Sequence, residues 1–326
     1  MAKVLMSKAN ISEGRRKEVL EGVANAVRAV AAVTLADWSG DPDHNRAVYT
    51  LLGSPEAVLE GAKALTESAL ENIDMSTHEG EHPRMGAVDV VPFIPLREME
   101  SDEAVGVARE YGAWLGARGV PVFYYEYAAT RPERESLPKI RKGQYEALPE
   151  KLQDPAWEPD EGPAEFNPRS GATVTGARFP LVAFNVNLKT DDLEIAQTIA
   201  RAVRHINGGY RFVRGMGFAL EDKGMVQVSM NLVNYEKTPI HRVLETIRSE
   251  ASRYGVQIAG TELIGSVPLG ALEEVVRFYL QTLDFAIDQI VVSALRVWRA
   301  VAWAFPPGQP PGVLGVVGAA GGLSCG

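Results

Sequence analysis

Hydrophobic and polar positions in the first part of the chain follow two different spacings. Apolar residues recur three or four positions apart over 16–31 and 55–73, which predicts two amphipathic helices. Strands are also expected over 3–6, 33–38 and 46–52, and over the mostly apolar run 88–94. The resulting order is β-α-β-β-α-β, the split β-α-β arrangement of ferredoxin-like folds.

The second half of the chain repeats this order. Helical spacing predicts helices over 191–206 and 239–254, and Asp222-Lys223-Gly224 predicts a hairpin turn. Strands are expected over 181–188, 210–220, 225–233 and 256–264. We therefore predict the α+β fold class, with two ferredoxin-like (split β-α-β) subdomains.

A helix expected over 103–117, a strand over 120–127 and a stretch rich in proline and glycine separate the two repeats. We predict an N-terminal subdomain over 1–178 and a C-terminal subdomain over 179–290. Residues 291–326 are expected to form an extension of uncertain structure, because the chain from 308 onward is rich in glycine and carries no charge.

Length, charge and cysteine content narrow the class of protein. The 326 residues suffice for two domains, and 33 Lys and Arg against 42 Asp and Glu give a net charge of −9, which disfavours a nucleic-acid partner. Cys325 is the single cysteine, so neither a disulfide framework nor a cysteine zinc cluster is expected. The start of the chain lacks the apolar core of a signal peptide, and no apolar run is long enough to span a membrane. We expect a cytoplasmic protein with no membrane partner.

The segment His78-Glu79-Gly80-Glu81-His82-Pro83 matches the zinc-protease pattern H-E-x-x-H. That pattern needs both histidines on one helix face, and Pro83 pushes the residue before it out of the helical region. The alternative is an extended loop that presents His82 as a general acid or base, with Glu79 or Glu81 orienting its second ring nitrogen. A third interpretation is a histidine that only hydrogen-bonds the loop.

Two further segments suggest ligand contacts. Residues 160–178 are rich in glycine, proline and hydroxyl side chains, whose exposed backbone groups could bind a flat heterocycle, although a linker has the same composition. Basic residues also gather between 201 and 214, where guanidinium groups could bind carboxylates or simply lie on a solvated helix face. These residues are Arg201, Arg204, His205, Arg211 and Arg214.

Taken together, several segments resemble the glutamate formiminotransferases. They read NISEG at 10–14, DPDHNRAVYT at 41–50, DMSTHEGEHPRMGAVD at 74–89, GQYEALPEK at 143–151, SGATVTGAR at 170–178 and AFNVNL at 183–188. The resemblance runs in this order from about residue 4 to residue 285. The long run around His82 is much more specific than the H-E-x-x-H pattern alone.

The resemblance implies transfer of the formimino group from N-formimino-L-glutamate to N5 of tetrahydrofolate, in histidine degradation. Tetrahydrofolate is then a co-substrate, no metal is needed, and His82 is the catalytic acid or base with Glu79 beside it. The resemblance also implies a homodimer, with folate held between the two subdomains of each chain. A separate cyclodeaminase is a possible partner, because the chain does not continue into the cyclodeaminase domain of the bifunctional animal enzymes.

The resemblance places the folate contacts in one loop, with a further contact at Arg204 or His205. The loop residues are Gly162, Pro163, Ala164, Glu165, Phe166, Asn167, Pro168, Arg169, Ser170 and Gly171.

Three alternatives stay open at this point. The same scaffold could transfer a formyl group from N-formylglutamate or act on 5-formyltetrahydrofolate. The chain could be a folate-binding module without catalysis, which the presence of His82 and Glu79 argues against. A zinc hydrolase is the most distant alternative.

Overall fold

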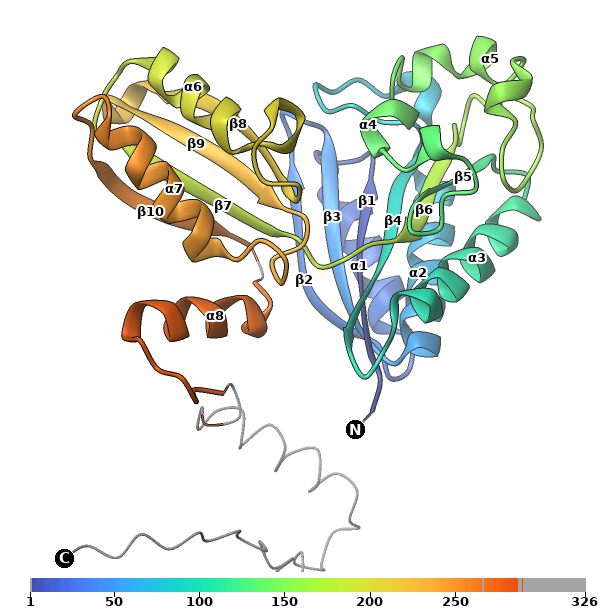
Figure 1. Ribbon diagram of the computed structural model, residues 1–326. Helices are drawn as coiled ribbons and strands as arrows, with labels where there is room; N and C mark the ends of the chain where they lie inside the picture. Colours follow the sequence, from blue (N-terminus) through green and yellow to red (C-terminus); the bar gives the residue numbers. More distant parts are fainter. Residues whose placement is uncertain (1, 266, 287–288, 290–326) are drawn as a thin grey trace, which may run out of the picture. The chain divides into compact units, whose positions relative to one another are not determined.

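The computed structural model describes residues 2–265, 267–286 and 289 (Figure 1). The chain divides into two compact units after Pro180. The predicted extension over 291–326 lies outside the described residues. Among the described residues, no helix combines the length and apolar character needed to cross a bilayer.

The first unit begins with the predicted β-α-β-β-α-β order. Its elements are β1 (Val4–Ile11), α1 (Lys17–Arg28), β2 (Thr34–Asp41), β3 (Arg46–Gly53), α2 (Pro55–Asn72) and β4 (Val88–Arg97). Their strands lie in the antiparallel order β2-β3-β1-β4. This is the strand order of a ferredoxin-like unit, so the predicted fold class is confirmed for this unit.

Two more strands widen the sheet of this unit. After α3 (Ser101–Gly116), β5 (Val122–Glu126) and β6 (Thr173–Ala177) add in parallel to β4, giving the order β2-β3-β1-β4-β6-β5. The sequence did not predict β6, because all five of its residues are buried and the run contains neither alternation nor a long apolar stretch.

Helices α1, α2 and α3 lie along one face of this sheet (Figure 1) and form the main core with it. Helix α1 buries Val19, Val23 and Val27, which share one helix face. Ser54 caps the N-terminus of helix α2, because its hydroxyl accepts a hydrogen bond from the Ala57 amide at 3.3 Å.

The opposite face of the sheet is covered only in part by its own unit. Short helices α4 (Leu137–Ile140) and α5 (Leu148–Lys151) pack over β4, β6 and β5 and form a second apolar cluster. Over β1 and β2 this face carries polar side chains instead, including Lys8, Asn10 and Asp37. We call this region the open face of the first unit.

The second unit has the same topology. Its elements are β7 (Val182–Leu188), α6 (Leu193–Val203), β8 (Val213–Leu220), β9 (Met225–Leu232), α7 (Ile240–Ser252) and β10 (Ile258–Ile264). The strand order β10-β7-β9-β8 again matches a ferredoxin-like unit, as predicted. The predicted hairpin turn is present, with Gly224 in the left-handed conformation at φ 56°.

Two features of this unit differ from the prediction. Helix α6 stops at Val203 because Arg204 adopts an extended conformation, although helical spacing predicted a helix to residue 206. A further helix, α8 (Leu269–Leu280), follows β10 and was not predicted. The ring of Phe278 on α8 stacks on the ring of His241 on α7 at 4.4 Å.

Candidate active site

The loop that leads into β4 contains His82 and is not helical. Residues 78–85 include no helical turn, so the histidine spacing of a zinc-protease helix is absent. The end of this loop pairs with the end of the 162–171 loop. The Ala87 amide donates to Ser170 O at 2.9 Å, and the Ala172 amide donates to Met85 O at 3.0 Å. A Cβ at Gly86 would lie 2.5 Å from Ala172 O, so only glycine permits this approach.

The imidazole of His82 faces two other side chains. Its Nε2 accepts a hydrogen bond from Arg46 Nη1 at 2.5 Å. Its ring lies edge-on to the ring of His44, with 6.2 Å between the centroids. The Nδ1 atom is buried, and a backbone hydrogen bond at Pro83 acts on the ring. Because a guanidinium can only donate, Nε2 is the unprotonated nitrogen and Nδ1 carries the proton.

The surroundings of His82 favour its neutral form. The pKa of His82 is lowered to about 4, mainly by burial. The positive charges of Arg46 and Arg141 lower the pKa further, and His44 adds an effect of the same sign. The imidazole is therefore an uncharged base at neutral pH, and its lone pair on Nε2 is occupied by Arg46.

The two carboxylates near this cluster bind other groups. Asp41 accepts hydrogen bonds from the amides of Asp43 and His44 at 3.0 Å and from His44 Nδ1 at 2.8 Å. Asp89 is fully buried, accepts from the Met85 amide at 2.9 Å and forms an ion pair with Arg141. Among the described residues, neither carboxylate forms an ion pair with Arg46.

A second hydrogen-bond network links the His82 loop to neighbouring segments of the first unit. Arg84 binds both carboxylate oxygens of Glu146, at 2.6 and 3.0 Å, and donates from Nε to His78 Nδ1 at 3.2 Å. His78 in turn donates from Nε2 to Asn45 O at 3.0 Å. The Asn45 amide donates to Glu79 O at 2.7 Å, which fastens the loop to the turn between β2 and β3.

Gly80 lets the loop approach that turn closely. A Cβ at this position would lie 2.6 Å from His44 O. The loop and the β2–β3 turn can therefore meet only if this residue has no side chain.

The predicted partner Glu79 does not contact His82. Its side chain is exposed, and among the described residues no hydrogen bond joins the carboxylate of Glu79 or Glu81 to the imidazole. Glu79 and Glu81 line a hollow of about 460 Å³ together with Arg15. The side chain that orients His82 is Arg46, which lies in the quoted segment 41–50 but was given no role from the sequence.

The loop predicted to bind folate lies beside the His82 segment. Asn167 shapes it, because its side-chain oxygen accepts from the amides of Arg169 and Ser170 at 3.0 and 3.2 Å. Tyr145 donates to Pro168 O at 2.6 Å, and its ring lies 5.4 Å from the ring of Phe166. The structure thus brings this loop and His82 together, because β6 follows the loop and pairs with β4.

The members of this loop differ in exposure. Gly162 has a φ of 82°, a left-handed backbone conformation that favours glycine. Ser170 and Gly171 are buried and Phe166 is partly buried. The other residues are exposed and could reach a ligand: Pro163, Ala164, Glu165, Asn167, Pro168 and Arg169.

Arg204 and His205 belong to the second unit. The guanidinium of Arg204 donates to the Asn207 side chain and, at 3.3 Å, to Gly215 O. The side chain of His205 is exposed. Of the other basic residues predicted there, Arg201 donates to Thr198 Oγ1 at 2.8 Å. A folate contact at Arg204 or His205 stays a prediction.

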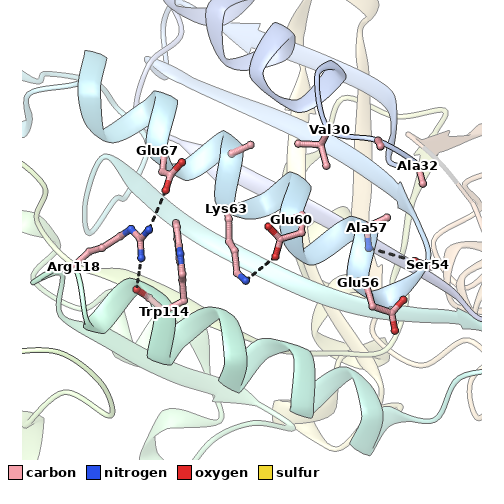
Figure 2. A pocket seen from close by; sticks show the side chains of 12 residues that line it. Val30, Ala32, Ser54, Glu56, Ala57, Glu60, Lys63, Glu67, Trp114 and Arg118 are labelled. Atoms are coloured by element: carbon pink, nitrogen blue, oxygen red, sulfur yellow. Dashed lines mark hydrogen bonds and ion pairs between the residues drawn. The ribbon is translucent and has the colours of Figure 1, made fainter.

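A hollow of about 710 Å³ lies on the helical side of the first unit, between α2 and α3 (Figure 2). Its two cations are already engaged. Lys63 pairs with Glu60 at 2.7 Å, and Arg118 pairs with Glu67 at 3.1 Å while lying 4.0 Å from the Trp114 ring centroid. Glu56 also lines this hollow, and hydrogen bonds from its own amide and from Ser54 lower its pKa, so it stays a charged carboxylate at neutral pH. We therefore assign the candidate active site to the His82 cluster, which holds a neutral base.

The chain is similar over most of its length to proteins of known family. The family model described as formiminotransferase domain, N-terminal subdomain, matches residues 4–178, and the formiminotransferase domain model matches residues 183–296. A glutamate formimidoyltransferase of Streptococcus pyogenes serotype M1 is 47% identical over 87% of this chain and 96% of its own length. The same-named protein of Thermoplasma acidophilum is 44% identical over 85% of this chain and 92% of its own.

A formimidoyltransferase-cyclodeaminase of Rattus norvegicus is 45% identical over 83% of this chain. The matched region covers 51% of that protein. The chain therefore spans about half of this bifunctional relative.

Proposed function

Because this chain belongs to the formiminotransferase family, we propose that it transfers the formimino group of N-formimino-L-glutamate to N5 of tetrahydrofolate. It is accordingly an enzyme, a one-carbon group transferase that uses tetrahydrofolate as its co-substrate. We place the reaction at His82. The observation that supports this placement is a neutral, half-buried imidazole beside the 162–171 loop.

The reaction requires one proton to move between two nitrogens. N5 of tetrahydrofolate attacks the formimino carbon, and a tetrahedral intermediate forms as His82 Nε2 accepts the proton from N5. The bond from that carbon to the glutamate nitrogen then breaks as His82 returns the proton to this nitrogen. Glutamate leaves, and the formimino group stays on N5. A single base that is neutral at the start can perform both transfers.

The 162–171 loop is proposed to hold the folate. Its exposed backbone groups and the ring of Phe166 offer hydrogen bonds and an apolar surface to a flat heterocycle. Residues 85–87 connect this loop to His82 through two backbone hydrogen bonds. Arg204 or His205 is proposed as a further folate contact, and Glu79 as a group near the site that contacts substrate and not the imidazole.

Three features implied by the family resemblance are retained as proposals: a homodimer, a cytoplasmic location and a role in histidine degradation. The cyclodeaminase named in the Rattus norvegicus relative suggests a separate cyclodeaminase as a partner.

A direct assay tests the proposed function. The purified protein is mixed with tetrahydrofolate and either N-formimino-L-glutamate or N-formyl-L-glutamate, and the folate product is followed by its absorbance. We expect turnover with the formimino donor. Turnover only with the formyl donor would replace this function by formyl transfer, and binding of folate without turnover of either donor would leave a binding module.

His82→Ala tests the placement of the chemistry. Loss of one general acid–base group lowers kcat by about a hundredfold to ten-thousandfold. Glu81→Ala is the matched control, because it removes an exposed carboxyl from the same loop. Full activity of His82→Ala would show that another group moves the proton.

A further inference from the structure

Arg46 is a half-buried cation whose neighbouring acids bind other groups. The Asp41 carboxylate, opposite Arg46 in the β2–β3 pairing, binds His44 and two backbone amides. The Asp89 carboxylate binds Arg141 and the Met85 amide. Arg46 hydrogen-bonds the neutral His82 imidazole, and among the described residues no carboxylate forms an ion pair with its guanidinium.

A positive charge removed from water needs a counter-ion or further hydrogen bonds. Burial lowers the pKa of Arg46 and the positive charge of Arg141 lowers it further, and the charges of Asp89 and Asp41 act in the opposite sense without reversing the shift. A buried donor in the same cluster, Arg141 Nε, also has no hydrogen-bond partner among the described residues. This combination of charge and a free donor fits a carboxylate ligand.

We propose that Arg46 binds the α-carboxylate of N-formimino-L-glutamate, and that this contact draws Arg46 away from His82 and exposes the Nε2 lone pair. This inference rests on the proposed function and deepens it. It names the residue that selects an α-amino acid as the donor, and it makes the base available only when the donor is bound.

The geometry of the donor explains the choice of the α-carboxylate. The formimino group is attached to the nitrogen of the α-carbon, and the α-carboxylate is attached to the same carbon. Two bonds of about 1.5 Å place the carboxyl carbon about 2.5 Å from that nitrogen. Groups that bind these two sites must therefore be close neighbours, and Arg46 Nη1 and His82 Nε2 are 2.5 Å apart.

The contact to Arg46 also explains how a weakly basic imidazole can act. In the free protein the Arg46 N–H occupies the lone pair of His82 Nε2, and the charge of Arg46 opposes protonation. A bound carboxylate neutralises that charge and accepts the N–H. The charged and titratable groups around His82 that remain are His44 and Asp41 on the β2–β3 turn, Asp89 on β4 and Arg141 after α4.

Nuclear magnetic resonance of ¹³C-labelled histidine tests this directly. The chain has five histidines, and the His82 signal is assigned by its loss in His82→Gln. We expect L-glutamate to raise the pKa of His82 in the parent protein. We expect 4-aminobutyrate, which lacks the α-carboxylate, to leave it unchanged. In Arg46→Gln the pKa should already be raised, with no further rise on adding L-glutamate.

Kinetics supply the second test. Arg46→Gln should raise KM for N-formimino-L-glutamate by about ten- to a hundredfold, the usual effect of losing one charge-assisted hydrogen bond. KM for tetrahydrofolate should stay within twofold. Arg46→Lys, which keeps the charge but not the planar fork, should restore part of the loss. Arg28→Gln, the same change on the exposed end of α1, is the control.

The two proposals fail in different ways. An inactive parent protein would overturn the proposed function. An active parent whose Arg46→Gln variant keeps the donor KM would overturn the role of Arg46, as would an equal effect of L-glutamate and 4-aminobutyrate on His82.

Discussion

We predict that replacing Arg84 lowers both the stability of the protein and its activity, because Arg84 anchors the loop that contains His82. Its side chain is 10% exposed and binds Glu146 twice, at 2.6 and 3.0 Å, and His78 Nδ1 at 3.2 Å. Arg84→Met keeps the volume of the buried stem but removes these bonds. The Glu146 side chain is 60% exposed, so its carboxylate returns to water when the pair is broken. The substitution therefore does not leave an unpaired charge buried away from water, and the large free-energy cost of such a charge is not added.

The expected loss follows from the bonds alone. The three bonds named above, at about 1 kcal/mol each, lower the free energy of unfolding by about 2 to 3 kcal/mol. Arg84 also donates to Gln144 Oε1 and to His78 O, both at 3.3 Å, and these long bonds add little. For a unit of this size that lowers Tm by roughly 5 to 10 °C. Because Arg84 also fixes the loop that carries His82, we expect kcat to fall by about ten- to a hundredfold at a temperature where the variant is folded.

Arg118→Met is the matched control. Arg118 also pairs with a glutamate, at 3.1 Å, but its side chain is 43% exposed. An exposed pair contributes at most about 1 kcal/mol. Scanning calorimetry gives Tm for both variants, and the folate assay gives kcat. An equal shift in Tm for the two variants, or a normal kcat for Arg84→Met, would refute the role given to this network.

The remaining predictions concern ionisation, backbone packing and the folate loop. Since the pKa of His82 is about 4 in the folded state, the acid limb of kcat/KM should lie near pH 4, and a limb near 6.5 would contradict the assignment. Between pH 4 and 6.5, His82 is protonated in the unfolded chain but not in the folded protein, so its contribution should lower the stability as the pH falls through this range. The urea midpoint of His82→Gln should therefore depend less on pH than that of the parent protein. Gly86→Ala should lower both Tm and kcat because its Cβ has no room, whereas Gly22→Ala, in open space on α1, should keep or raise Tm. Tyr145→Phe removes the bond to the folate loop and should raise KM for tetrahydrofolate about fivefold with kcat unchanged; an equal rise in the donor KM would argue against a folate-specific loop.

The order of elements could be predicted because helices and strands leave clear periodic patterns. In α1 every core residue falls on one helix face, and β4 reads as a mostly apolar run interrupted by Asp89. The strand β6 could not be predicted in this way. Its sequence Thr173–Ala177 contains glycine and two threonines, and its stability comes from pairing with β4 and β5 on either side.

The candidate site shows the same limit. His82 stands out in the sequence because an unusual motif surrounds it, and the 162–171 loop stands out by composition. The partner Arg46 lies 36 positions earlier in an ordinary strand. Only the approach of the His82 loop to the β2–β3 turn, which Gly80 permits, brings the two side chains together. Sequence spacing therefore suggested Glu79, whereas the fold supplies Arg46.

The two units show that one topology can carry two kinds of surface. On the open face of the first unit, burial lowers the pKa of Lys8, the charge of Arg178 lowers it further, and Asp37 acts in the opposite sense. The corresponding face of the second unit holds a different network. Glu262 accepts hydrogen bonds from Asn187 at 2.9 Å and Gln227 at 3.2 Å, and these bonds lower its pKa.

This contrast follows from side chains, because the four ferredoxin-like strands of the two sheets have equivalent orders, β4-β1-β3-β2 and β10-β7-β9-β8. A ferredoxin-like backbone leaves one sheet face free of its own helices, and the residues on that face decide what it can bind. The first unit combines cations with a neutral histidine, which suits an anionic donor and a proton transfer. If the proposed roles of Arg46 and His82 hold, the chemistry depends on these few positions and not on the repeated fold.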